Sequence, residues 1–274
     1  MMRAASREAY RVAADRLDAI GRDGDAAEMA KIGDELLAVA NLLDREPRLR
    51  RALADPSRSG ADRAALLDSL VGRSVTAHTR EVLEVAVSGR WSGAVELLGG
   101  IEMLGVDALL AGADLAGDLA EVEDEMFRFG QVIDGSPELA AVLGELTVDP
   151  AQRNTLVDRL LTGKAKPVTV RLVHLAVAGF GGRTLTGALT RLVELSADRR
   201  KLQVAYVTVA TPLSDAEERQ LGTRLAQMYG REMSVKVTVD PDVLGGARVL
   251  IGSDLYDGTI SRRLADARNT LVGK

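Results

Sequence analysis

Residues 34–53 read DELLAVANLLDREPRLRRAL, and ninety positions later residues 124–143 read DEMFRFGQVIDGSPELAAVL. Without a gap, the two stretches align an Asp-Glu pair, a further aspartate, a proline and two leucines. The identical pairs are Asp34 and Asp124, Glu35 and Glu125, Asp44 and Asp134, Pro47 and Pro137, Leu49 and Leu139, and Leu53 and Leu143. Unrelated helices can share an apolar period, but proline and acidic residues in one register are much harder to match by chance. This agreement indicates an internal duplication.

The same shift stays in register well beyond these stretches. Further identical pairs are Arg63 and Arg153, Leu66 and Leu156, Asp68 and Asp158, Leu70 and Leu160, and Gly89 and Gly179. We therefore predict two related helical bundles, over residues 1–110 and 111–199. Residues 111–114 are small and weakly periodic, so we place the join between the bundles there.

Helices are indicated by apolar residues that recur at three- and four-residue steps. The first set is Tyr10, Ala13, Leu17 and Ile20, and the second is Met29, Ile32, Leu36, Val39 and Leu43. This spacing places each set on one face of a helix, with charged residues opposite. Pro47 and Pro56 interrupt the pattern, because proline removes a backbone donor and disfavours helix in the residue before it.

The period changes after residue 200, where strands are indicated. Residues 202–210 form an apolar and β-branched run, and residues 235–239 alternate valine with polar residues. Both patterns are typical of strands. Residues 248–251 predict a further short strand, with residues 254–257 as its hairpin partner.

Two helices accompany these strands. Ser214 and Glu217 form a capping-box pattern that opens a helix ending at Gly230. We expect its buried face to carry Leu221, Leu225 and Met228. Residues 259–271 predict a last amphipathic helix, with Thr259 as its cap and Ile260, Leu264, Ala267 and Leu271 in phase. The whole chain is therefore predicted to be mainly α, with two related bundles followed by a small α+β domain over residues 200–274.

Composition excludes several classes of protein. Hydrophobic residues make up 46% of the chain but aromatic residues only 3%, which favours aliphatic helix packing over an all-β sandwich. The 35 basic and 40 acidic residues are interspersed, so no basic patch predicts binding to nucleic acid or anionic lipid. There is no cysteine, which excludes disulfides and thiolate chemistry. Glu96, Glu102 and Asp107 interrupt the most apolar stretch, so we expect a soluble protein without a membrane span.

The sequence predicts no catalytic, cofactor-binding or metal-binding residue. His78 and His174 have no second ligand at metal-binding spacing, and we expect both to be structural or surface residues. Gly163-Lys164 lacks the remainder of a phosphate loop and is better explained as the end of a helix.

Three further groups have more than one interpretation. The acidic residues at 123–125 and 217–218 could serve in acid-base chemistry, but we interpret them as solvated charge on polar helix faces. Trp91, next to Arg90, is either an interface anchor or a packing residue.

Residues 239–252, VDPDVLGGARVLIG, carry a resemblance to a known family. Together with Asp257-Gly258-Thr259-Ile260 and Arg263-Leu264, this stretch resembles the signature of the ATP synthase delta subunit, whose mitochondrial relative is the oligomycin-sensitivity-conferring protein. Residues 205–212 resemble the first strand of that family's C-terminal domain, and Arg183 an arginine near the end of its helical bundle. The family usually has one six-helix bundle, whereas this chain has two related copies. Which copy takes the usual docking position stays open.

The resemblance implies a non-catalytic subunit of the peripheral stalk of an F-type ATP synthase, at the cytoplasmic face of the bacterial plasma membrane. The implied partners are the N-terminal helices of the alpha subunits, bound by the helical bundle, and the membrane-anchored b subunit, bound by the C-terminal domain. No nucleic acid, cofactor or small-molecule substrate is implied. The alternative is a helical scaffold or adaptor that is unrelated to ATP synthase and shares only a small α+β terminal domain.

Overall fold

The computed structural model describes residues 2–145, 147–260 and 262. These residues form twelve α-helices, one short 3-10 helix and a four-stranded mixed sheet, so the predicted mainly α fold with a C-terminal α+β part is confirmed. The chain divides into two compact units, Met1–Val122 with Leu143–Ala188, and Glu123–Val142 with Leu189–Lys274. The repeat boundaries at 110/111 and 199/200 stay a prediction.

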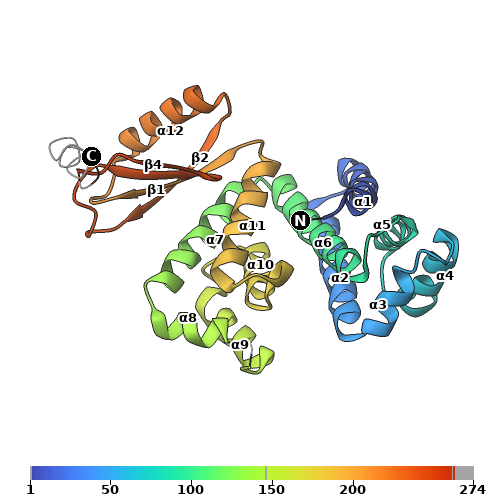
Figure 1. Cartoon of the computed structure of the whole chain (residues 1–274). Helices are drawn as coiled ribbons and strands as arrows, with labels where there is room; N and C mark the ends of the chain where they lie inside the picture. The colour runs from blue at the N-terminus through green and yellow to red at the C-terminus, as the bar shows by residue number, and fades with distance from the viewer. Residues whose placement is uncertain (1, 146, 261, 263–274) are drawn as a thin grey trace, which may run out of the picture. The chain divides into compact units, whose positions relative to one another are not determined.

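The helices before the sheet repeat in the same order (Figure 1). The first five are α1 (Ala4–Asp23), α2 (Ala26–Arg45), α3 (Pro47–Leu53), α4 (Gly60–Val71) and α5 (Ala77–Ser88). They are followed by α6 (Ala94–Leu115), α7 (Leu119–Asp134), α8 (Pro137–Gly144), α9 (Pro150–Leu161), α10 (Pro167–Val177), η1 (Phe180–Gly182) and α11 (Leu185–Arg199). A shift of ninety residues places α2 to α6 on α7 to α11 in turn. Pro47 begins α3 and Pro137 begins α8, as expected of a residue whose missing N–H is not needed in a first turn.

Helix α6 belongs to both copies of the repeat. The ninety-residue shift also places α1 on residues 94–113, which lie inside α6. Helix α6 contacts α1, α2, α3 and α5 of the first copy, and it also contacts α10 of the second. Residues 111–114 lie within this helix, so the join that we expected there is continuous helix. Their weak period has a physical reason: Ala108 to Ala113 are buried on every side of the helix.

Helices α2 and α6 pack closely along their length in the first unit. A side chain at Gly33 would place its Cβ 3.0 Å from the carbonyl oxygen of Gly105 and 2.7 Å from Cγ of buried Leu109. Only glycine allows the two backbones this approach. The apolar stripes predicted for α1 and α2 face the same core, which confirms both: the buried residues include Ala13, Leu17, Ile20, Met29, Ile32, Leu36, Val39 and Leu43.

We expect Gly33→Ala to lower the free energy of unfolding by about 1–3 kcal/mol, because the added methyl group must displace the buried Leu109 side chain and crowds the Gly105 carbonyl. Gly99→Ala is the matched control. A Cβ at Gly99 meets nothing within 4 Å, so this change should stabilise α6 by about 0.5–1 kcal/mol through helix propensity. Urea denaturation of the full chain measures both values. Equal effects of the two substitutions would contradict the close contact.

In each copy of the repeat, a buried arginine binds backbone carbonyl groups at the C-terminal end of a helix, α5 in the first copy and α10 in the second. The Arg63 guanidinium donates to five carbonyl oxygens at 2.7–3.1 Å, those of Asp55, Arg58, Val87, Ser88 and Gly89. Arg153, ninety residues later, is also buried and donates to Val177, the counterpart of Val87, at 2.6 Å. The identity of these two arginines therefore reflects a shared structural role: each satisfies backbone carbonyls at the end of a helix.

Arg63→Met should destabilise the first unit by roughly 3–5 kcal/mol, because the buried carbonyl groups lose their donor. The control is Arg51→Met, since Arg51 is exposed on α3. We expect the control to unfold in urea at nearly the wild-type midpoint. A small effect of Arg63→Met would show that water replaces the guanidinium.

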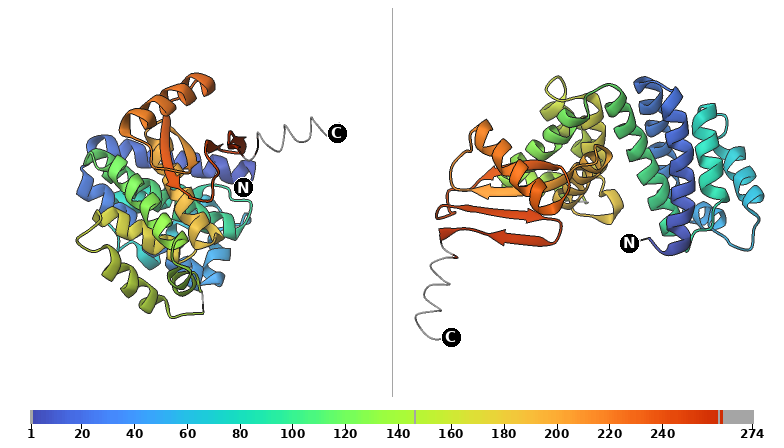
Figure 2. Two further views of the ribbon diagram at one scale, coloured as in Figure 1. Left: turned by 90° about the vertical axis from the view of Figure 1, so that its left-hand side faces the viewer. Right: turned by 90° about the horizontal axis from the view of Figure 1, so that it is seen from above.

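The C-terminal sheet consists of β1 (Gln203–Val209), β2 (Met233–Val239), β3 (Ala247–Ile251) and β4 (Asp254–Asp257). The strand order is β2-β1-β3-β4, with β1 and β2 parallel and the other pairs antiparallel. Helix α12 (Asp215–Tyr229) connects β1 to β2 and lies against one face of the sheet (Figures 1 and 2). Between helix and sheet lie Ala205, Val207, Val209, Leu225, Val249 and Ile251.

Most local predictions for this domain are confirmed. The Ser214–Glu217 capping box is complete, and Gly245 and Gly246 have positive φ, as a tight reversal requires. The expectation that Met228 faces the core is wrong. Met228 is 66% exposed, and Tyr229 takes that place at the end of α12. The hydroxyl oxygen of Thr259 accepts the Arg262 N–H at 3.3 Å, as the predicted cap should. Ile260, which was expected on the apolar face of this helix, is 49% exposed, and residues 261 and 263–271 of the predicted helix lie outside the described residues.

Candidate functional site

A cluster of charges around buried Glu123 and Lys236 joins α7 to the sheet within the second unit. Lys236 on β2 is 4% exposed, and its Nζ lies 2.8 Å from Oε1 of Glu123, which is fully buried. The same ammonium group pairs with Asp124, and Arg200 pairs with the other oxygen of Glu123 at 3.0 Å. Ser234 on β2 also donates to Glu123. Two cations thus balance two carboxylates, which is the condition under which buried charge is tolerated.

Uncharged contacts extend this junction along the sheet. Gln131 on α7 donates to the carbonyl oxygen of Val237 at 3.0 Å and to the Thr238 hydroxyl at 3.3 Å. Because β2 is an edge strand, this bond covers an otherwise open edge. The rings of Phe127 and Tyr206 lie 6.3 Å apart between centroids. Burial raises the pKa of the Tyr206 hydroxyl, and the nearby carboxylates of Glu194 and Glu123 raise it further. The polar face of β2 is therefore covered by α7.

The sequence interpretation of Glu123 and Asp124 as solvated charge is wrong for Glu123 and holds only for partly exposed Asp124. The sequence does contain a pattern that indicates burial of Glu123. Leu119, Val122, Met126 and Phe129 form a buried stripe on α7, and residue 123 falls within that stripe at helical spacing. A charged residue inside an apolar stripe requires a buried partner. The partner is Lys236, more than a hundred residues away, so no local pattern identifies it.

We expect Lys236→Met to weaken the attachment of the sheet to α7 by roughly 3–5 kcal/mol, since it leaves a buried carboxylate without its closest cation. The double variant Glu123→Met with Lys236→Met should regain most of this loss, because matched apolar groups replace the pair. Hydrogen exchange of β1 and β2 amides measures the opening of the junction. If the free-energy effects of the two substitutions simply add in the double variant, the two residues do not interact.

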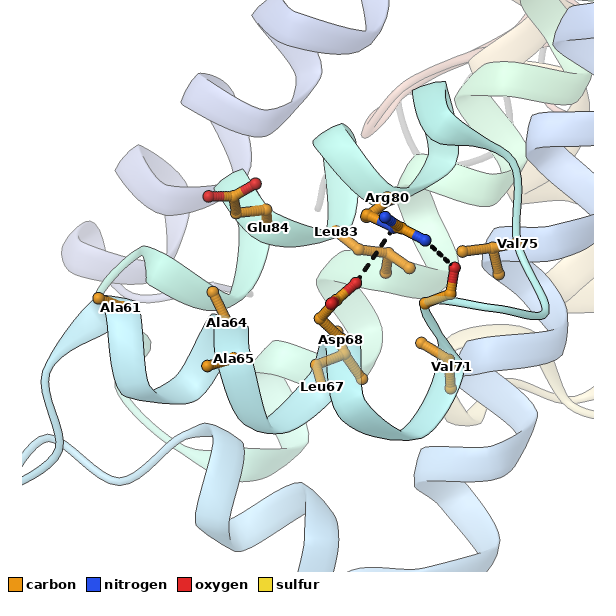
Figure 3. Close-up of a pocket in the computed structure, with 11 residues that line it drawn as sticks. Ala61, Ala64, Ala65, Leu67, Asp68, Val71, Val75, Arg80, Leu83 and Glu84 are labelled. Atoms are coloured by element: carbon orange, nitrogen blue, oxygen red, sulfur yellow. Dashed lines mark hydrogen bonds and ion pairs between the residues drawn. The ribbon is translucent and has the colours of Figure 1, made fainter.

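A second feature is an open groove between α4 and α5, with a volume of about 300 Å³. Its α4 wall carries Ala61, Ala64, Ala65 and Asp68, and its α5 wall carries Arg80, Leu83 and Glu84. Figure 3 shows Arg80 reaching from α5 to α4, where Nε lies 3.1 Å from Oδ1 of Asp68 and the guanidinium donates to the Gly72 carbonyl. This bridge closes one end of the groove and leaves the alanine end open.

A third feature is a hollow of about 490 Å³ in the C-terminal domain, between the end of β1, the start of α12 and the double glycine. Leu213, Leu221 and Arg224 line it beside Gly245 and Gly246. The sheet face opposite α12 also exposes apolar surface beyond α7, at Leu250 and at Leu255, which is 59% exposed. This domain therefore offers apolar surface separate from that of the helices.

The remaining residues singled out in the sequence have local roles. Nδ1 of His78 lies 2.6 Å from Oε1 of Glu28, and Nε2 of His174 lies 3.0 Å from Oδ1 of Asp158. Gly163 has φ of +76° directly after α9, as expected of a glycine that ends a helix. Trp91 is buried, and its Nε1 donates to the Ala86 carbonyl at 2.7 Å, which favours the packing interpretation.

Within the described ranges, no three His, Cys, Asp or Glu side chains are grouped so that they could hold a metal ion. Over the same part of the chain, no helix is both long enough and apolar enough to cross a membrane. Glu102 on α6 accepts the N–H of Gly181 at 3.1 Å, and burial raises the pKa of its carboxyl. These groups hold elements of the fold together.

The fold and its junction define a class of protein: a repeated helical bundle that carries an α+β domain on a buried set of ion pairs. Comparison with known proteins gives the family. Residues 106–271, more than half of the chain, match the ATP synthase delta (OSCP) subunit family. The chain belongs to this family, and the resemblance found in its C-terminal residues is confirmed.

Full-length relatives support the same assignment. A protein of Salinispora arenicola named ATP synthase subunit delta is 60% identical over 272 residues, which cover 99% of each chain. The protein of the same name from Streptomyces griseus is 41% identical over 99% of this chain and all of its own. That of Frankia alni is 39% identical over 90% of this chain and 89% of its own. The family match begins inside α6, so most of the first copy lies outside it.

Proposed function

We propose that this chain is a non-catalytic subunit of the peripheral stalk of an F-type ATP synthase. In this role it links the alpha/beta catalytic head to the membrane-anchored b subunit and resists the torque of the rotor. Proton translocation is then coupled to ATP synthesis, because the head cannot turn with the rotor. The chain acts at the cytoplasmic face of the bacterial plasma membrane as a peripheral subunit, without a cofactor, a nucleic acid or a small-molecule substrate of its own.

The observation that carries the proposal is the junction of Glu123, Asp124, Arg200 and Lys236. A link that transmits force between two partners needs a connection between its binding domains that does not swing freely. A charge-balanced cluster around buried Glu123 and Lys236 meets this need, since opening it leaves both of these charges unpaired. Family membership supports the complex in which the link works and argues against an unrelated scaffold.

The two ends of the link are suited to different partners. Helical bundles present grooves between neighbouring helices, and an amphipathic helix places its apolar face in such a groove. We assign the N-terminal helices of the alpha subunits to the bundles on this basis. The C-terminal domain, with its apolar hollow and the exposed Leu250 and Leu255, is assigned to the b subunit.

Copurification tests the partners. A tagged full-length chain, recovered from membranes solubilised in mild detergent, should bring with it the alpha and b subunits. A Leu255→Lys variant should retain alpha and lose b, because it places a charge on the exposed sheet face without touching the core. Recovery of neither subunit with the wild-type chain would favour an unrelated adaptor function.

Coupling tests the mechanical role. In inverted membrane vesicles that carry Lys236→Met, ATP hydrolysis by the head should continue while ATP-driven proton pumping falls by roughly half or more, since a loosened junction lets the head turn. The matched control is the double variant with Glu123→Met, which should pump near the wild-type level. If the single variant opens the junction in hydrogen exchange and pumps normally, the junction does not carry the torque.

A further inference from the structure

We propose that the α4–α5 groove of the first copy is the docking site for one partner helix, an amphipathic α-helix with basic residues beside its apolar stripe, and that the second copy has lost this site. The inference deepens the proposed function and rests on it, because it assigns a helical partner to one of the two bundles. The partner is defined by its chemistry alone.

The shape of the groove favours a helix. The α4 wall residues Ala61, Ala64, Ala65 and Asp68 are spaced by three, one and three positions, so they lie along one face of the helix. Arg80, Leu83 and Glu84 lie along the facing side of α5 in the same way. Figure 3 shows the small alanine side chains on α4, with Leu67 on the same helix and Leu83 on the facing helix α5. Because methyl groups project so little, another helix can approach closely here.

The floor of the groove is apolar and already fixed. Leu67 and Leu83 are 2% exposed, and Val71 is also buried, so the floor belongs to the core of the first unit. Ala61 and Ala65 above it are exposed. A partner that covered the groove would therefore bury apolar surface without rearranging the core.

The charges at the rim of the groove favour a partner helix that carries basic residues. Asp68 is neutralised by Arg80 across the closed end. Glu84 stands at the open end, is exposed, and has no ion pair or hydrogen bond among the residues that the structure describes. The open end thus carries uncompensated negative charge next to apolar surface. A helix with lysine or arginine bordering its apolar stripe is complementary to this pattern, and an acidic helix is repelled.

The second copy has the same helices with a different surface. The ninety-residue shift replaces Ala64 by Asn154, Ala65 by Thr155 and Glu84 by His174. The Thr155 hydroxyl donates to the Ala151 carbonyl at 2.8 Å, and His174 lies 3.0 Å from Asp158 on the facing helix. Larger polar side chains therefore stand on the wall, and the free carboxylate at the rim is replaced by an imidazole that lies against Asp158.

The test uses the full chain and two synthetic helical peptides of about 18 residues, long enough for stable helix. Both carry leucine at helical spacing, and one borders the stripe with lysine where the other has glutamate. The lysine peptide should bind about tenfold more tightly in fluorescence anisotropy. Hydrogen exchange should show protection of α4 and α5. Glu84→Lys should reverse the preference between the two peptides.

Two matched variants localise the binding. Ala64→Asn with Ala65→Thr gives the first groove the residues of the second copy, so it should fold normally and weaken the lysine peptide by about tenfold or more. Asn154→Ala with Thr155→Ala, the reverse change in the second copy, leaves the first groove untouched and should bind like the wild type.

Three results would overturn the inference: no binding of either peptide, unchanged binding by the Ala64→Asn, Ala65→Thr variant, or protection on α9 and α10 in place of α4 and α5. None of these results depends on proton pumping. A failed groove and a failed stalk function are therefore distinguishable.

Discussion

Glu123 has no exposed surface, and a carboxylate that is removed from water must be surrounded by donors and opposite charge. Lys236 and Ser234 supply these from β2, and Arg200 supplies them from the chain just after α11. This one requirement fixes how the sheet meets α7, because a rotation or slide of β2 would leave the charge unpaired. The contacts of Gln131 and Phe127 follow from the same placement.

The residue that corresponds to Glu123 in the first copy of the repeat meets a different requirement. Ninety residues before Glu123 lies Gly33, where the absence of a side chain lets α2 approach α6. The same position on the same helix of the repeat therefore has two opposite uses. In the first copy it admits another helix to the core, and in the second it holds the ion pairs of the C-terminal domain. The buried arginines at 63 and 153 show the contrasting case, in which both copies keep one role.

The elements that local chemistry determines were predictable from sequence. The stripes of α1 and α2, the capping box at Ser214 and the alternation of β2 needed only near neighbours. The features that depend on distant residues were not predictable. Burial of Glu123 depends on a lysine far along the chain, and the α4–α5 groove depends on how two alanine-bearing faces meet. Met228 was misplaced because the stripe of α12 shifts to Tyr229 at the helix end.

Helix α6 takes a position in both copies of the repeat, and this limits how the length of such a chain can change. Residues 94–113 of α6 end the first copy and also stand in the register of α1, so a further repeat in this register would add five helices and ninety residues, not six helices. An insertion of any other size would break this register. Growth of this kind is modular, as in other repeat proteins.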